Sequence, residues 1–147
     1  MAKKRGADAL PDRPGIRRFS WLGGAPKRDL PANAASDSLR SELQVFIKND
    51  DPAAAERLLE SKAADLSTDA LTELRYRVAW SFYIENDDFS AKRLAGVARA
   101  AGGEWATQAS WAYGLASWRL KDYAAAFEAF DSVARLAAND DLKAAGL

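Results

Sequence analysis

Asn49-Asp50-Asp51-Pro52, Asn86-Asp87-Asp88-Phe89 and Leu120-Lys121-Asp122-Tyr123 are three versions of one phrase. Each follows a run with helical periodicity and opens an Ala-rich run with the same periodicity. Aligned on Pro52, Phe89 and Tyr123, the copies are 37 and 34 residues apart. This spacing predicts a helix–turn–helix unit that repeats along the chain and stacks on its neighbours to bury its apolar face.

The apolar residues on either side of these phrases predict six helices and a short seventh at the end of the chain. The expected helix starts are Ser36-Asp37, Pro52, Ser67-Thr68-Asp69, Asp87-Asp88, Trp105 and Asp122, with Asn139-Asp140-Asp141 for the seventh. Gly102-Gly103 is expected to end the fourth helix, because glycine is favoured just beyond a helix end. We therefore expect an all-α fold, built as an antiparallel helix-pair solenoid.

Charge divides the chain into two expected regions. Residues 1–35 hold eight basic and three acidic side chains, a net charge of +5, and four of the five prolines, so an irregular basic segment is expected there. Residues 36–147 then carry a net charge of −5 and form the expected helical-repeat domain. Only Phe19 and Trp21 accompany the basic residues, which favours a solvated leader over a nucleic-acid-binding arm.

The composition removes several classes of chemistry. The chain has no cysteine and no histidine, which excludes disulfides, thiol nucleophiles, Cys/His zinc sites and imidazole acid–base catalysis. It has no run of about 18 apolar residues, so no membrane span is expected. The first residues lack the apolar core of a secretory signal. Cytoplasm and periplasm both remain open, the latter for an internal piece of a longer exported protein.

Five residues mark the expected repeat positions: Phe89, Gly114, Tyr123, Ala126 and Phe130. Gly114 would let two helices approach closely, Tyr123 would wedge between repeats, and Ala126 would lie at the helix crossing. In this order of small and aromatic residues the last helix pair resembles a tetratricopeptide repeat, whose unit is 34 residues long. The preceding pair shares the pattern mainly through Phe89. The resemblance implies a superhelix of tetratricopeptide type.

A longer resemblance spans about residues 40–147. The residues that carry it are Gly103-Glu104-Trp105, Trp111, Gly114-Leu115-Ala116, Trp118-Arg119, Asp122-Tyr123, Phe130, Val133-Ala134 and Leu142-Lys143-Ala144-Ala145-Gly146-Leu147. In these the chain resembles the helical superhelix of soluble lytic murein transglycosylases of the alphaproteobacterial type. In that family the superhelix carries a C-terminal lysozyme-like domain, which cleaves peptidoglycan with a single catalytic glutamate. The resemblance implies a periplasmic scaffold segment that lacks the catalytic domain.

The acidic residues do not reproduce the family's catalytic motif, which is Glu-Ser with an aromatic two residues later and a downstream Gly-Leu-Met-Gln. The one Glu-Ser pair, Glu60-Ser61, has Ala63 at the aromatic position, and no Gly-Leu-Met-Gln follows. The adjacent acids Asp87/Asp88 and Asp140/Asp141 are expected to cap helix starts rather than to hydrolyse a glycoside. We therefore expect no catalytic, cofactor-binding or metal-binding residue in this chain.

Trp105, Trp111 and Trp118 are the candidate contacts for a glycan or a partner, because aromatic platforms bind sugars. Trp111 and Trp118 are seven residues apart and share a helical face. Aromatic residues at helical spacing are more often core residues, and this is the interpretation we favour for the tryptophans.

The expected function is a non-catalytic scaffold segment that positions a lytic transglycosylase on glycan strands. Its expected partners are other helical repeats, the missing catalytic domain and peptidoglycan, but no nucleic acid. Self-association is also expected, because Leu142 and Leu147 do not belong to a polar capping helix. The alternative is a stand-alone cytoplasmic adaptor of tetratricopeptide type that binds a partner peptide in its concave groove. A basic-tailed nucleic-acid accessory protein is a third hypothesis.

Overall fold

The computed structural model describes residues 34–146, which form six α-helices and no strand. The helices are α2 (Ala34–Lys48), α3 (Pro52–Ser61), α4 (Thr68–Ile84), α5 (Asp88–Ala100), α6 (Ala106–Arg119) and α7 (Tyr123–Ala144). Two short 3-10 turns, η1 (Ala63–Asp65) and η2 (Gly103–Trp105), lie between the helix pairs. The prediction of an all-α fold is confirmed for these residues. The predicted irregular segment lies outside them, apart from its last two residues, which belong to α2.

The three repeated phrases form three corners of the same construction, one within each helix pair. Each corner contains one non-glycine residue in the left-handed region, namely Asp50 (φ 60°), Asn86 (φ 66°) or Lys121 (φ 65°). The N–H of the following residue donates to the carbonyl five positions earlier, over 2.9 Å in all three corners: Asp51 to Phe46, Asp87 to Phe82 and Asp122 to Ser117. This is the Schellman arrangement, which ends one helix and turns the chain sharply into the next.

An aspartate begins the second helix of each pair, as predicted. The side chains of Asp51, Asp87 and Asp122 each accept a hydrogen bond from the backbone N–H three residues later, over 3.1, 3.1 and 3.3 Å. These bonds satisfy N–H groups that would otherwise have no partner in the first turn. The fourth residue after each cap is an alanine that is fully buried: Ala55, Ala91 and Ala126. A small side chain there lets the second helix lie close to its neighbours.

The capping aspartates align the three repeated phrases differently from the prediction: the middle phrase is shifted by one residue. Asp51, Asp87 and Asp122 are equivalent, so the true intervals are 36 and 35 residues. Asp88, rather than Phe89, is therefore the counterpart of the first helical residue in the other pairs. Phe89 falls one position further into α5, where its side chain is 73% exposed. The predicted alignment placed Phe89 at the start of its helix, because Pro52 and Tyr123 are the first helical residues in the other two copies.

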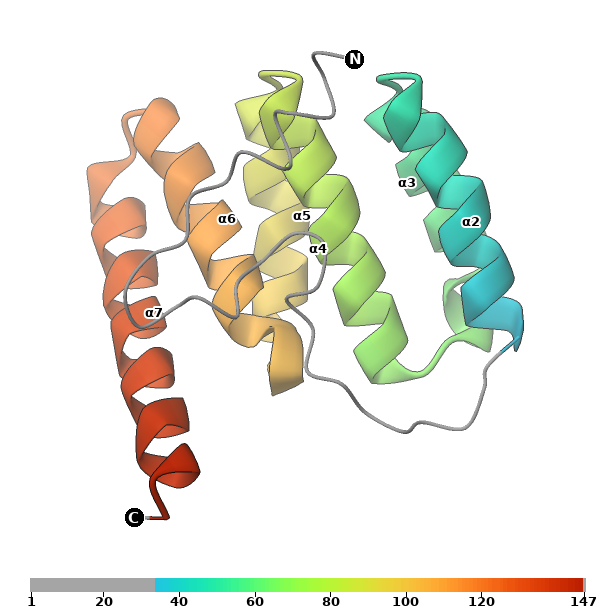
Figure 1. The fold of residues 1–147 in the computed structure, drawn as a ribbon. Coiled ribbons are helices and arrows are strands. Elements are labelled where there is room, and N and C mark those ends of the chain that lie inside the picture. The colour runs from blue at the N-terminus through green and yellow to red at the C-terminus, as the bar shows by residue number, and fades with distance from the viewer. Residues whose placement is uncertain (1–33, 147) are drawn as a thin grey trace.

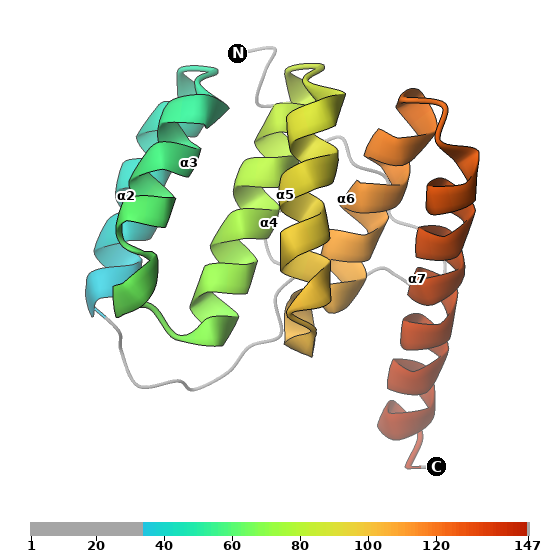
Figure 2. The same ribbon diagram turned by 180° about the vertical axis from the view of Figure 1, so that it is seen from behind.

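The helices follow one another in a row from α2 to α7 (Figure 1). In that view α2 and α4 lie in front of α3 and α5, and the view from behind reverses this order (Figure 2). Besides each helix and its successor, the first helices of neighbouring pairs are in contact, α2 with α4 and α4 with α6. Ion pairs tie the second helices together, with Glu56 of α3 bound to Arg93 of α5 at 2.7 and 2.8 Å. The first two pairs thus lie side by side, with their first helices in one layer and their second helices in the other, and α6 and α7 continue the row.

The predicted seventh helix is wrong. Asn139-Asp140-Asp141 lies inside α7, a single helix of 22 residues. No glycine, proline or left-handed residue interrupts the chain there, and polar side chains on an exposed helical face do not end a helix by themselves. Asp140 and Asp141 therefore do not cap a helix start. The predicted helix start at Trp105 agrees with the structure to within one residue: Trp105 ends the 3-10 turn η2 and is the N-cap of α6.

Candidate functional site

An exposed group of apolar side chains surrounds the corner between α6 and α7. We call it the aromatic patch and define it as Trp118, Leu120, Tyr123 and Phe127. The Trp118 ring lies 4.8 Å from the Tyr123 ring and 6.0 Å from the Phe127 ring, in both cases edge to face. Aromatic side chains gathered on a surface are typical of protein interfaces, because they combine a large apolar area with few rotatable bonds. The patch is therefore a candidate partner-binding surface.

The three tryptophans do not share one environment. Trp105 is only 4% exposed and stacks on Tyr76 at 5.7 Å, so it is a core residue as predicted. Trp111 is half-buried, with its ring 5.3 Å from that of Phe130. Trp118 is 48% exposed, and the prediction that it belongs to the core is wrong. Its ring lies in the last turn of α6, where its aromatic contacts come from the first turns of α7.

Two of the predicted repeat positions, Gly114 and Phe130, meet between α6 and α7. A β-carbon on Gly114 would lie 2.4 Å from the Phe130 ring, so the absence of a side chain is what admits that ring. Ala126 is fully buried at the equivalent position of the third pair. Tyr123, expected to wedge between repeats, instead packs against Trp118 and belongs to the aromatic patch.

Three of the acidic residues singled out in the sequence, Glu60, Asp87 and Asp88, are engaged in ion pairs or caps. Arg75 of α4 donates to both carboxylate oxygens of Glu60, over 2.9 and 2.8 Å. The hydrogen bonds from Arg75 hold the pKa of Glu60 below its usual value. Glu60 is therefore ionised at neutral pH, whereas a general acid has to hold its proton there. Asp87 caps α5, and Asp88 accepts from Nε of Arg119 at 2.8 Å.

A second candidate site is a surface pocket of about 340 Å³ between the last three helices, which we call the arginine pocket. Its lining residues are Gly96, Arg99 and Ala100 of α5, Ala106, Ser110 and Tyr113 of α6, and Ser132 and Leu136 of α7. The pocket thus combines one cation and three hydroxyl groups with small apolar walls. This composition is typical of a site for a small ligand that has one polar end.

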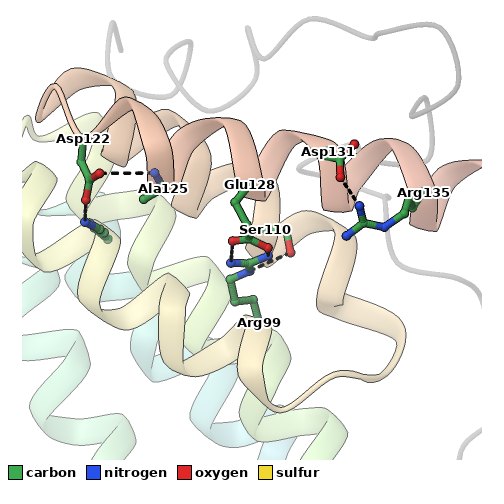
Figure 3. A network of polar contacts seen from close by, with 8 residues as sticks. Arg99, Ser110, Asp122, Ala125, Glu128, Asp131 and Arg135 are labelled. Carbon is green, nitrogen blue, oxygen red and sulfur yellow. Dashed lines mark hydrogen bonds and ion pairs between the residues drawn. The ribbon is translucent and has the colours of Figure 1, made fainter.

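Arg99 is the centre of the polar contacts in this pocket (Figure 3). Its Nε donates to Oγ of Ser110 over 3.1 Å, and its two Nη atoms donate to the two carboxylate oxygens of Glu128 over 2.8 and 3.1 Å. Its guanidinium carbon lies 5.0 Å from the centre of the Tyr113 ring. The hydrogen bonds from Arg99 lower the pKa of Glu128, so its carboxylate is ionised at neutral pH.

Sequence reasoning did not find the arginine pocket. Arg99, Ser110 and Glu128 are single residues on three different helices, separated in sequence by 11 and 29 positions from Arg99. No motif links them, and only the packing of α5, α6 and α7 brings them together. The matching charges of Arg99 and Glu128 were visible, but nothing in the sequence selects this pair from the other arginines and glutamates.

Comparisons of this chain with protein-family models, with curated proteins and with solved structures found no match. None of the helices within residues 34–146 is long and apolar enough to cross a membrane. Among the same residues, no cluster of three or more acidic side chains is placed to hold a metal ion.

Proposed function

We propose that this chain is a non-catalytic segment of a helical-repeat scaffold, which binds its neighbour or partner through the aromatic patch. The observation that carries the proposal is the repetition of one corner three times, with an exposed aromatic surface at the last of them. Identical corners and contacts between alternate helices are what a solenoid requires, since each pair buries its apolar face on the next.

The more specific proposal is that the scaffold is the superhelix of a periplasmic lytic transglycosylase and that it holds the enzyme on glycan strands. The sequence resemblance over about residues 40–147 supports this assignment. The ionised state of Glu60 also agrees with a segment that carries no catalytic acid of its own. A stand-alone cytoplasmic adaptor is the second candidate, and the same exposed patch favours it, because an adaptor also needs an apolar surface for its partner.

Sedimentation with purified murein sacculi tests the specific proposal. We expect the chain to cosediment with sacculi and to release no anhydro-muropeptides. Phe127→Ala, in the aromatic patch, should weaken cosedimentation. Phe89→Ala is the matched control, because it removes an equally large and even more exposed ring outside the patch.

Failure of the unmodified chain to cosediment would refute the peptidoglycan assignment and leave the adaptor as the remaining proposal. Release of anhydro-muropeptides that is lost in Glu60→Gln would refute the non-catalytic proposal as a whole. Equal effects of Phe127→Ala and Phe89→Ala would show that the patch is not the contact surface.

A further inference from the structure

The arginine pocket holds its cation in a fixed orientation. Arg99 has a side-chain exposure of only 18%, and Ser110, which accepts from its Nε, is buried. The Tyr113 ring covers one face of the guanidinium. A guanidinium restrained from these directions keeps its two Nη groups aimed at one place. Such a fork matches the two oxygens of a carboxylate.

Glu128 now occupies that place, but it is the exposed member of the pair. Its side-chain exposure is 58%, against 18% for Arg99. An exposed carboxylate can move into water at little cost, because water solvates it nearly as well as the ion pair does. Arg99 is the more restrained member, since Ser110 accepts from its Nε and the Tyr113 ring lies against its guanidinium. The pair is therefore built to open on the glutamate side.

The remaining walls indicate what else could enter. Ala100, Ala106 and Leu136 supply an apolar surface in the same pocket as Arg99, and its volume of about 340 Å³ accommodates a small ligand. Hydroxyl groups of Ser110 and Ser132 are also in the lining and can hydrogen-bond to an amide. Apolar walls beside a carboxylate-binding fork suit a short chain that ends in a carboxylate and bears small apolar side chains.

We propose that the arginine pocket binds the terminal carboxylate of a short peptide, which replaces Glu128 on Arg99 while its small apolar side chains contact Ala100, Ala106 and Leu136. Glu128 occupies the site when it is empty and mimics the ligand, since its own carboxylate meets both Nη groups within hydrogen-bond distance. This site is independent of the aromatic patch and of the scaffold assignment.

Titration of the full chain followed by NMR tests the proposal, with the Nε–Hε signal of Arg99 as the reporter. The probes are N-acetyl-Ala-Ala with a free carboxylate, the same peptide as its amide, acetate and inorganic phosphate. We expect the peptide acid to shift the Arg99 signal and to bind about tenfold more tightly than acetate, because two methyl groups contact the apolar walls. The peptide amide should leave the signal in place.

Several outcomes would overturn the proposal. Equal binding of the amide would show that the carboxylate is not recognised. Equal binding of acetate would reduce the ligand to any small acid, and tighter binding of phosphate would replace a carboxylate site by a phosphate site. No shift of the Arg99 signal up to about 20 mM peptide acid would mean that the pocket is not a ligand site at all.

Two substitutions test the exchange between Glu128 and the ligand. Glu128→Gln should tighten binding of the peptide acid by up to about fivefold, because an exposed competing ion pair has been removed. Glu56→Gln is the matched control, since Glu56 makes the same two-bond contact to Arg93 away from the pocket, and it should leave the affinity unchanged. Unchanged affinity in Glu128→Gln would refute the exchange. Arg99→Lys should lose binding at least tenfold, and if this variant does not fold, the two glutamine variants still decide the question.

Discussion

Gly114 and Phe130 face each other so closely that any β-carbon at position 114 would lie 2.4 Å from the nearest atom of the Phe130 ring. The contact joins α6 to α7 and seats the last helix of the stack. Because Gly114 has no side chain, the Phe130 ring fits between α6 and α7.

Gly114→Ala should therefore destabilise the protein, because the added methyl group overlaps a ring that is packed on Trp111. Overpacking of this kind costs about 1–3 kcal/mol of unfolding free energy. Urea unfolding followed by circular dichroism measures it. Gly96→Ala is the control, since a β-carbon there would lie 3.3 Å from the edge of Tyr113, and a smaller change is expected. Adding Phe130→Leu to Gly114→Ala should restore part of the loss; no restoration would place the strain elsewhere.

Lys121→Gly should stabilise the protein by about 0.5–1 kcal/mol, because Lys121 holds a left-handed backbone conformation that glycine adopts without a steric penalty. Thermal unfolding is the measurement. Lys121→Ala separates this effect from the loss of the side chain, since alanine keeps the penalty and should give no gain. A similar gain in both variants would contradict the explanation.

Trp105→Ala and Trp118→Ala should differ sharply in stability. Trp105 is buried against Tyr76, and truncation of a buried tryptophan costs about 3–5 kcal/mol. Trp118 is half-exposed, and its truncation should cost only about 1 kcal/mol. The comparison of the two melting temperatures also checks the environment assigned to each ring. A loss in Trp118→Ala as large as that in Trp105→Ala would mean that the patch is covered in solution.

Acid should weaken the fold partly through Glu60. Arg75 lowers the pKa of Glu60 below its usual 4.5, so their ion pair adds stability above about pH 4.5, and this stability is lost as the pH falls through the lowered value. Glu60→Gln should reduce the difference in unfolding free energy between pH 7 and about pH 3. Arg75→Gln should reduce it equally and raise the Glu60 pKa measured by NMR. A Glu60 pKa at or above 4.5 in the unmodified chain would contradict the ion pair.

The aromatic patch should also drive self-association at high protein concentration, because an exposed apolar surface of this kind is buried when two copies meet. Sedimentation velocity over a range of concentrations would detect it. Phe127→Asp should shift the population to monomer, whereas Phe89→Asp should not. If both variants remain associated to the same extent, another surface is responsible.

The sequence predicted the features that depend on neighbouring residues. The capping aspartates at positions 51, 87 and 122 act within a few residues of themselves, and their helix starts are confirmed. Features that depend on what lies across a helix were not predicted. Trp111 and Trp118 lie on the same face of α6, but the Trp111 ring packs against Phe130 whereas the Trp118 side chain is half-exposed to solvent. Periodicity selects a helical face and does not show how far along the helix that face is covered.

The same distinction accounts for the candidate sites. The residues of the aromatic patch are close together in the sequence, so their proximity was predictable, but their exposure to solvent was not. The ion pair of Arg99 and Glu128 connects residues whose positions are related only through the packing of α5 and α7 on α6. Charge alone does not predict which arginine pairs with which glutamate. An exposed ion pair contributes little free energy compared with the burial of apolar surface, so the packing of the helices decides which charges meet.

The corners have a consequence for how such a chain can change in length. Each makes its Schellman and capping hydrogen bonds among fewer than ten consecutive residues, so these bonds involve no backbone group from another part of the chain. A gene that gains or loses about 35 codons between equivalent positions would therefore delete or duplicate a whole helix pair and leave every remaining corner intact. In the proposed solenoid, we therefore expect recombination to lengthen or shorten the fold by one pair at a time.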